Sequence, residues 1–427
     1  MLILKNRLRV RNVSQAVLAL VFVCIMFPSL AQVRINSPYS MFGPGEVKGN
    51  DYFRNMSMGG ISQGFRSNVS VNYLNPASYT AIDSLSFVFE GTVFSHIYQQ
   101  QYNNQSQTSS YSAMGNLNFA FPVTPRLRMA AGLMPYSQIG YKISESQQLD
   151  GVTHYLYEGS GGINKVYLGA GVKLFGGLSA GINASYLFGR SEDLLVASSD
   201  SIGFFRTFWS FSDDIDGLML TYGLQWEQDL ANDRKLTLGV SYTGETSLQM
   251  SRNRVIFRDM PGVWGVDTLS DVKGEEGKMV IPANMGMGAF MRFNNRWAGG
   301  LDFNTQNWSQ FSTYGQQHNL NNAWQVRAGA VHNPRIQTYS GFLSRLEYRA
   351  GFRYGQSFLN VNDNTFSEFG ISFGVAVPVR RSLSALNLGF EYANRSAADS
   401  NLVSENFFKF NIGVNIYERW FMRRRFF

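Results

Sequence analysis

The chain has 427 residues, 42 of them glycine and 15% aromatic, and a mean hydropathy of −0.16. No apolar run approaches the about 20 residues of a transmembrane helix, which argues against a helical membrane protein. The formal charge is +7, but four of the basic residues lie within the first eleven positions, and the remaining +3 is too small to predict a nucleic-acid partner.

Residues 1–31 are typical of a cleaved signal peptide. A basic start precedes the apolar stretch 16–27, and Ser29-Leu30-Ala31 supplies small residues at the cleavage position. We therefore expect the mature chain to be exported and to begin at Gln32. The only cysteine, Cys24, lies within the apolar stretch, so we expect the mature chain to contain no disulfide and no thiolate metal site.

Residues 32–82 form a segment without sustained alternation. Its many aromatic and methionine side chains make it too apolar for a disordered tether, and we predict that it is an N-terminal plug buried inside a barrel. Met and Phe suit a pocket for flexible apolar chains, although plug packing is the plainer interpretation for any single residue. The candidate pocket residues are Phe42, Phe53, Met56, Met58 and Phe65.

Residues 83–417 show the alternation of β-strands. In 408–416, for example, Phe and aliphatic side chains alternate with Lys409, Asn411, Gly413 and Asn415. Strands of about ten residues with an apolar outer face and a polar inner face are what a bilayer requires of a closed barrel. Fourteen strands are predicted to start near residues 84, 111, 127, 163, 178, 217, 235, 282, 296, 323, 346, 366, 383 and 406. The predicted fold is all-β, an antiparallel transmembrane barrel of about 14 strands in the outer membrane.

The predicted connections indicate an orientation. Those after even-numbered strands are mostly short, as at 124–125, 176–177, 231–233, 294–295 and 380–381. Those after odd-numbered strands are mostly long, notably 189–216 and 248–281, while the connection near 333–345 is long on the short side. Short turns face the periplasm and long loops face outside in such barrels. Residues 418–427 are expected to be a C-terminal tail.

The third predicted strand, 129–141, contains Pro135. Proline cannot donate to the hydrogen-bond ladder, and with Gly132 and Gly140 nearby we expect an inward kink that opens a gap in the wall. The plainer interpretation is that Pro135 lies at the outer rim, beyond the ladder.

The predicted loop 189–216 contains five aromatic residues within eight positions. Exposed aromatic clusters usually mark a binding or interaction surface, whereas the plainer interpretation is packing of the loop against its neighbour. These residues are Phe204, Phe205, Phe208, Trp209 and Phe211. They are followed by Asp213, Asp214 and Asp216, for which a solvated acidic turn is favoured over a cation site.

Four short motifs occur in a fixed order along the chain. They are Gly59-Gly60 with Asn75-Pro76-Ala77, then 281–286 (IPANMG), then Asp302 with 307–311 (NWSQF), and finally Arg327 with Gly329. In this order the chain resembles the outer-membrane long-chain fatty acid transporters (FadL type), a family that also includes aromatic-hydrocarbon channels. The tail after the last strand, with Arg423, Arg424 and Arg425, departs from the family pattern.

The resemblance implies a fourteen-stranded barrel with an N-terminal plug. It also implies a lateral opening on the third strand, at Pro135 and Gly140, and a hydrophobic capture groove walled by the loops 189–216 and 248–281. Asn75-Pro76-Ala77 is expected to fix the turn between plug and strand rather than to contact ligand.

We therefore expect passive uptake of hydrophobic small molecules such as long-chain fatty acids, with outer-membrane lipid and the ligand as partners. An alternative is an accessory role, because some proteins resembling this family bind protein partners in type IX secretion or surface assembly. A hydrophilic porin is disfavoured by the plug. No enzyme, cofactor or metal site is expected, since His96, His154, His318 and His332 are scattered and no nucleophile elbow, P-loop or dinucleotide fingerprint occurs.

Overall fold

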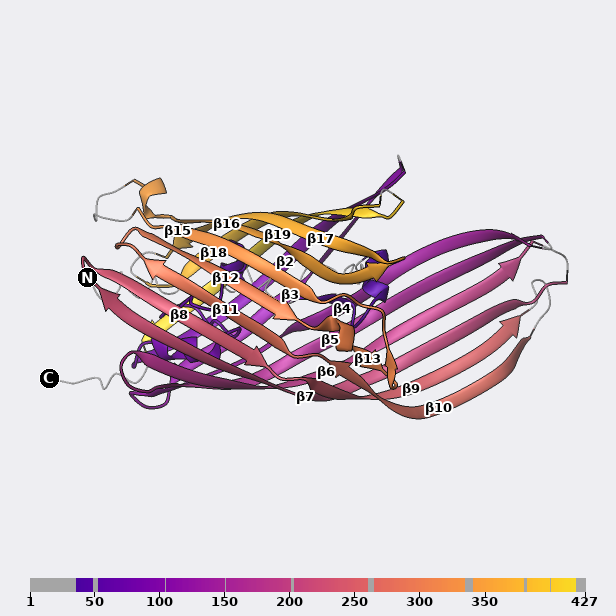
Figure 1. The fold of residues 1–427 in the computed structure, drawn as a ribbon, viewed down its shortest axis with the longest axis horizontal. Helices are drawn as coiled ribbons and strands as arrows, with labels where there is room; N and C mark the ends of the chain where they lie inside the picture. The colour runs from indigo at the N-terminus through magenta and orange to yellow at the C-terminus, as the bar shows by residue number, and fades with distance from the viewer. Residues whose placement is uncertain are drawn as a thin grey trace, which may run out of the picture.

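The computed structural model describes residues 36–48, 53–103, 105–149, 151–200, 203–259, 265–334, 341–379, 382–399 and 401–419 (Figure 1). The expected signal peptide and residues 420–427 of the expected tail lie outside the described residues. Among the described residues, no helix is long and apolar enough to cross a bilayer.

Long antiparallel strands make up most of the molecule. The larger strands are β2 (Ser86–Tyr102), β3 (Gln105–Pro122), β4 (Leu127–Leu149), β5 (Gly151–Lys173), β6 (Leu178–Ser199), β7 (Arg206–Leu230), β8 (Arg234–Thr243), β9 (Thr246–Asp259), β10 (Val266–Ile281), β11 (Asn284–Arg292), β12 (Trp297–Gln306), β15 (Ala323–His332), β16 (Glu347–Val361), β17 (Asn364–Pro378), β18 (Ala385–Ala397) and β19 (Ser404–Arg419). Smaller elements between them are η3 (Trp308–Gln310), β13 (Ser312–Thr313), β14 (Gln316–Gln317) and η4 (Leu343–Arg345).

These strands close into a barrel of fourteen. Strand β19 pairs with β2 from Ser404↔Gln101 to Arg419↔Ser86, which joins the two ends of the sheet. Two barrel strands are interrupted, one between β8 and β9 and the other at Pro282 between β10 and β11. With each interrupted strand counted once, the predicted all-β, fourteen-stranded antiparallel barrel is confirmed.

Around much of the wall, the apolar side chains of the strands point outward and the polar side chains point inward, as predicted. In β19, Phe410 and Ile412 are exposed on the outside, whereas Asn411 and Asn415 are buried in the interior. An apolar outer face against a polar inner face is the arrangement that a bilayer requires of a barrel.

The prediction of two long loops, at 189–216 and 248–281, is wrong. Strand β6 continues to Ser199 and β7 begins at Arg206, while β9 continues to Asp259 and β10 begins at Val266. The apolar-out pattern ends where the bilayer-facing belt ends, but the backbone ladder continues beyond it with mixed side chains. Parts of β4, β5, β6, β7, β9 and β10 project together beyond the other strands, to the right in Figure 1, and we call this part the upper sheet.

The N-terminal segment, residues 36–82, contains η1 (Pro38–Met41), β1 (Glu46–Val47), α2 (Phe53–Met56) and η2 (Pro76–Ala81). Its contacts extend to strands all around the barrel. The backbone N–H of Gly59 donates to Ser372 on β17, the side chain of Asn183 on β6 donates to the carbonyl of Tyr73, and Asn75 donates to carbonyls of β7 and β8. A chain segment with partners on opposite walls lies within the barrel.

Candidate functional site

The wall is incomplete between β3 and β4. These strands pair only from Pro122↔Arg128 to Leu117↔Leu133, and no further pairing joins them within the described residues. Beyond the Leu117↔Leu133 pair, the remaining part of β3 pairs only with β2, whereas β4 continues along β5 to Leu149. Pro135 lies two residues beyond the last β3 pair, and the β4–β5 register shifts between Pro135 and Ser137. A proline and a bulge therefore coincide with the break in the ladder.

Three residues of the N-terminal segment, Glu46–Lys48, bridge this break, and we call them the strap. Their backbone pairs with β4 (Val47↔Ser137), and the N–H of Lys48 donates to the carbonyl of Tyr136 at 2.8 Å. The Lys48 ammonium reaches the opposite lip, where it donates to the hydroxyl of Tyr111 on β3 at 2.8 Å.

An ion network holds the other end of the strap. The guanidinium of Arg395 on β18 contacts both carboxylate oxygens of Glu46 at 3.0 Å, and it also pairs with Glu368 at 2.6 Å and Glu405 at 3.2 Å. Burial disfavours the charged form of Glu46, but Arg395 and then Lys48 hold the pKa of its carboxyl below the ordinary value. Glu46 is therefore an anion at neutral pH.

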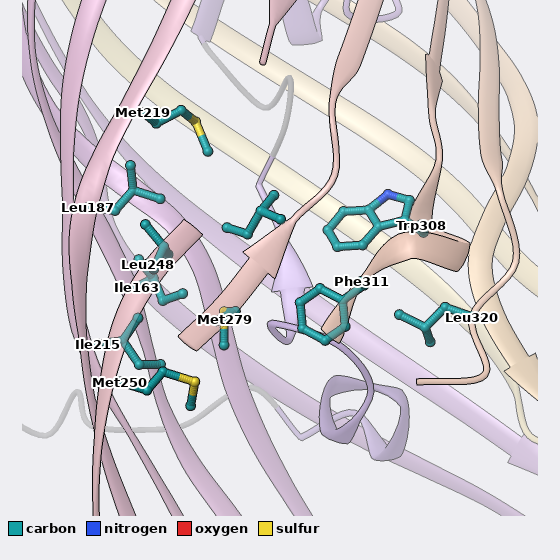
Figure 2. Close-up of a cluster of buried hydrophobic side chains, with 11 residues drawn as sticks. Ile163, Leu187, Ile215, Met219, Leu248, Met250, Met279, Trp308, Phe311 and Leu320 are labelled. Carbon is teal, nitrogen blue, oxygen red and sulfur yellow. The ribbon is translucent and has the colours of Figure 1, made fainter. Parts of the chain in front are cut away.

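A cluster of apolar side chains faces the interior beside the strap (Figure 2). It draws on β5, β6, β7, β9, β10 and η3, and Phe42 and Val47 of the N-terminal segment pack against it. We call it the apolar cluster; its buried members are Ile163, Leu187, Ile215, Met219, Leu248, Met250, Met279, Ile281, Trp308, Phe311 and Leu320.

Sequence reasoning missed the apolar cluster because alternation separates two faces without saying which one points inward. Leu238 and Val240 of β8 face outward, whereas Leu248 of β9 is fully buried, so the phase inverts between the two strands. The signal in the sequence is the interruption at 244–245, which shifts the alternation by one position.

A cavity of about 300 Å³ lies where these features meet. One part of its lining is apolar, including Val47, Met219 and Trp308. The other part carries six cationic side chains, Lys48, Lys165, Arg327, Arg353, Arg395 and Lys409, against the carboxylates of Glu46, Glu368 and Glu391. The cavity is thus amphipathic, with an excess of three positive charges.

Residues of the predicted plug motifs attach the N-terminal segment to the inner side of the wall by hydrogen bonds. The carboxylate of Asp302 on β12 accepts hydrogen bonds from the backbone N–H groups of Ser62 (2.5 Å) and Gln63 (2.8 Å). Asn75 caps η2 by accepting from the N–H of Ala77 at 3.2 Å, and its amide donates to the carbonyl of Gln63 at 2.9 Å.

Two glycines of the predicted motif meet the wall at close range. Gly59 and Gly60 have φ of +69° and +84°, which other residues rarely adopt. On the facing strand, a Cβ added to Gly351 would lie 2.0 Å from the backbone nitrogen of Gly59. The backbone of the segment touches the backbone of the wall here, without intervening side chains.

One family model, described as BamG, matches residues 13–427. The chain belongs to the BamG family. No curated protein matches the sequence.

Several solved structures have the same fold as this BamG-family chain. A crystal structure of a FadL homologue from Pseudomonas aeruginosa is 14% identical, with a TM-score of 0.57, and the match covers 88% of this chain and 99% of that one. The CymD monoaromatic hydrocarbon channel is 15% identical (TM-score 0.56, 90% and 98% covered). The toluene transporter TodX of Pseudomonas putida is 14% identical (TM-score 0.60, 86% and 98% covered). At this identity, the similarity establishes the fold.

The five candidate pocket residues do not form one site in this BamG-family barrel. Met56 lines the cavity, and Phe42 packs against the apolar cluster. Met58 and Phe65 are buried elsewhere, with Phe290 on β11, and the rings of Phe65 and Phe290 meet edge to face at 5.3 Å. The side chain of Phe53 lies outside the described residues.

The aromatic residues of 204–211 are divided rather than clustered. Phe204 and Phe205 are exposed between β6 and β7. Phe208 stacks on Phe257 of β9 at 4.6 Å, whereas Trp209, the next residue in β7, points to the opposite face of the upper sheet. The prediction of one aromatic loop cluster is wrong because Phe208, Trp209 and Phe211 lie in strand β7, with Phe211 on the same face as Trp209.

The acidic residues at 213–216 are also in β7, not in a turn. Asp213 forms a two-point ion pair with Arg252 (2.7 and 2.8 Å), and Asp214 pairs with Arg190 at 2.7 Å. The carboxylates of Asp213 and Asp214 are each neutralised by an arginine of a neighbouring strand, whereas Asp216 accepts a hydrogen bond from the hydroxyl of Tyr186 at 3.2 Å. Within the described residues, no group of three or more His, Cys, Asp or Glu side chains is placed to hold a metal ion.

Proposed function

We propose that this protein is an outer-membrane channel for the passive uptake of hydrophobic small molecules such as long-chain fatty acids. The observation that carries the proposal is the unpaired stretch of wall between β3 and β4, which lies beside the amphipathic cavity with its partly apolar lining. In the proposed route, a ligand enters past the upper sheet, occupies the cavity and leaves sideways between β3 and β4. Pro135 and Gly140 lie on the strand that forms one lip of this exit.

The chemistry of the cavity suits such a ligand. Burial of each methylene against the apolar cluster would contribute about 0.8 kcal/mol, so an acyl chain can be captured without any energy source or cofactor. The positive excess opposite the apolar wall suits a carboxylate at one end of the chain. The structural similarity to CymD, a monoaromatic hydrocarbon channel, and to TodX, a toluene transporter, supports the hydrophobic part of this proposal.

The test is uptake of a fluorescent fatty acid into liposomes that contain the purified protein. Met219 lines the cavity within the apolar cluster, and Met219→Gln places an amide there at nearly constant volume. We expect uptake to fall several-fold. Met41→Gln is the matched control, because Met41 is exposed, and it should leave uptake unchanged. Uptake by the unmodified protein no faster than by empty liposomes would refute the proposal.

The upper sheet favours a second candidate function, an accessory role with protein partners in type IX secretion or surface assembly. It extends beyond the neighbouring barrel strands (Figure 1). The connection between its strands β6 and β7 carries the exposed aromatic side chains of Phe204 and Phe205. The double variant Phe208→Ser with Trp209→Ser alters both faces of the upper sheet. If partners bind there, a protein that co-purifies with the unmodified barrel in mild detergent is lost while uptake is retained; the uptake proposal expects slower uptake instead.

A further inference from the structure

We infer that residues 141–149 of β4, which we call the β4 edge, are a docking site for an extended segment of a partner protein, which adds one strand to the upper sheet. The inference rests on the second candidate function and deepens it, because it names the docking surface and the chemistry of the partner. Within the described residues, β4 pairs with β3 only as far as Leu133 and with the strap at Ser137 and Gln138, whereas its pairing with β5 continues to Leu149. The β4 edge therefore has a neighbouring strand on one side only.

The direction of the backbone groups along the β4 edge follows from Gly140. Its N–H donates to the hydroxyl of Ser40, and its carbonyl accepts from the N–H of Ser37, both at 3.0 Å, so these two groups point away from β5. The β4–β5 register has no shift from Ser137 to Leu149, and the direction of the backbone groups alternates along a strand. The β4 edge therefore presents outward the N–H and carbonyl groups of Lys142, Ser144, Ser146 and Gln148.

The two outer strands of the upper sheet differ in how their edges are protected. On the far side, the pairing of β10 with β9 contains two register shifts within 268–275. Bulges of this kind bend an edge strand and hinder the addition of another strand. The β4 edge has neither a bulge nor a proline, and its lysine, Lys142, forms an ion pair with Glu158 of β5 instead of covering the edge. Of the two edges, the β4 edge is the one suited to accept a strand.

A row of apolar side chains ends at the β4 edge. On the face that continues the barrel interior, Ile143 is paired with Tyr157 and Tyr157 with Leu195. Leu195 is paired with Trp209, and Trp209 with Ile256 of β9. All five side chains are half-buried. Because directly opposed side chains on one face of a sheet stabilise each other, a strand added beside β4 buries Ile143 further and lengthens this row by one side chain.

The side chains along the β4 edge define the chemistry of the partner. On the same face as Ile143, the exposed carboxylate of Glu145 accepts a hydrogen bond from Gln147 at 2.8 Å and has no ion pair within the described residues. The other face carries, besides Lys142 with its ion pair, neutral polar side chains, those of Ser144, Ser146 and Gln148. The partner that fits is an extended segment with apolar side chains and one lysine or arginine on one face, and neutral polar side chains on the other.

The test uses a fluorescent synthetic peptide in which valine and threonine alternate and one valine is replaced by lysine. The peptide is mixed with the purified full chain in mild detergent, and we expect saturable binding, measured as a rise in fluorescence anisotropy. A scrambled peptide without alternation should not bind. Ser144→Pro removes one N–H from the β4 edge but leaves the ladder to β5 intact, so the affinity should fall at least about ten-fold.

A proline in the other outer strand is the matched control. The carbonyl of Lys278 on β10 accepts from the N–H of Tyr314 and so points away from β9, and the backbone groups of Glu276, two residues earlier, point the same way. Glu276→Pro therefore removes an outward N–H without altering the β4 edge, and the affinity for the peptide should be unchanged. Equal affinity of the unmodified protein and Ser144→Pro, or no binding of the alternating peptide to the unmodified protein, would overturn the inference.

Hydrogen exchange supplies a second measurement that needs no variant. When the peptide binds, exchange of the outward amide groups of Lys142, Ser144 and Ser146 should slow several-fold. The amide groups of Ile143 and Glu145 point toward β5 and should change little. Binding without this alternation would place the peptide on a face of the upper sheet and would overturn the assignment of the β4 edge.

Failure of this inference is distinct from failure of the function on which it rests. If the peptide does not bind but a co-purifying protein is lost in Phe208→Ser with Trp209→Ser, the second candidate function stands and the β4 edge is refuted. A dimer of the purified chain that Ser144→Pro dissociates would show that a second copy of this chain occupies the edge, which also overturns the assignment of a partner protein.

Discussion

Asp302 shows how a single side chain positions the N-terminal segment. It is buried on β12, and its carboxylate accepts two backbone N–H groups of the segment, at Ser62 and Gln63. Hydrogen bonds to a charged acceptor are stronger than neutral ones, and these two satisfy backbone donors of the buried turn at Ser62 and Gln63.

Replacing this acceptor should loosen the segment. We expect Asp302→Asn to weaken the attachment of the N-terminal segment to β12 by about 1.5–3 kcal/mol, since the amide is uncharged and presents one oxygen. Protease cleavage within residues 53–82 should accelerate while the barrel stays folded. Asp229→Asn is the control, because that carboxylate is exposed and pairs with Lys235 at the surface. Equal cleavage of Asp302→Asn and the unmodified protein would contradict the anchoring role.

Gly351 gives a second prediction at this scale. A methyl group there would lie 2.0 Å from the backbone nitrogen of Gly59, so the segment or the strand must move. We expect Gly351→Ala to lower the unfolding midpoint in urea by an amount equivalent to about 1–3 kcal/mol. Gly341→Ala, with no atom within 4 Å of its added Cβ, should have no measurable effect. Similar midpoints for the two variants would show that the close approach is relaxed at little cost.

At the scale of the element, β4 is the strand on which the proposed exit depends. Pro135→Ala supplies a backbone N–H and lets β3 extend its pairing beyond Leu133. We expect fatty acid uptake to fall several-fold, with unfolding temperature unchanged or higher. Pro125→Ala, in the turn between β3 and β4, is the matched control. Uptake that is preserved in Pro135→Ala would indicate that the proline is not what keeps the wall open.

The strap should also respond to acid. Its Glu46 carboxyl is faced by Arg395, Lys48, Glu368 and Glu405, and its pKa is held below the ordinary value of about 4.3. A carboxyl with a depressed pKa contributes stability that is present above its ordinary pKa and is lost as pH falls through the pKa of the folded state.

We therefore expect a nitroxide label on Met41→Cys to keep constant mobility from pH 8 to pH 5 and to become more mobile only below about pH 4. In Glu46→Gln, mobility should be high throughout this range. A transition centred near pH 6 would point to a different titrating group.

The elements themselves were predictable from the sequence to an unequal degree. Alternation predicted the strands and the short turns, such as the one at 231–233, because a bilayer permits only one pattern on the outer face. It did not predict the upper sheet, where Arg206 to Ser212 continue a ladder outside the belt that the bilayer constrains. Nor did it predict the apolar cluster, because Leu248 and Met250 follow the phase inversion at 244–245 and lie in the segment 248–281, for which a loop is predicted instead of the observed strand β9.

At the scale of the whole molecule, barrel and N-terminal segment form one packed body. Fold class and strand number followed from alternation, since the strands must close for every backbone group to be paired and bacterial barrels of this kind have an even number of strands. The candidate site did not follow in the same way. Pro135 marked the break in the wall, but the strap that spans it depends on Glu46 and Arg395, which lie 349 positions apart in the chain and carry no local signal.

The place of the N-terminal segment has a consequence for the order in which the protein is made. Its residues are synthesised before any barrel strand, yet their partners lie on strands from β4 to β19. These contacts can form only once the later strands are present. The pairing of β2 with β19 joins the first and last barrel strands and closes the wall around this segment. Such sequence-distant pairings form slowly, so we expect closure to set the pace of biogenesis.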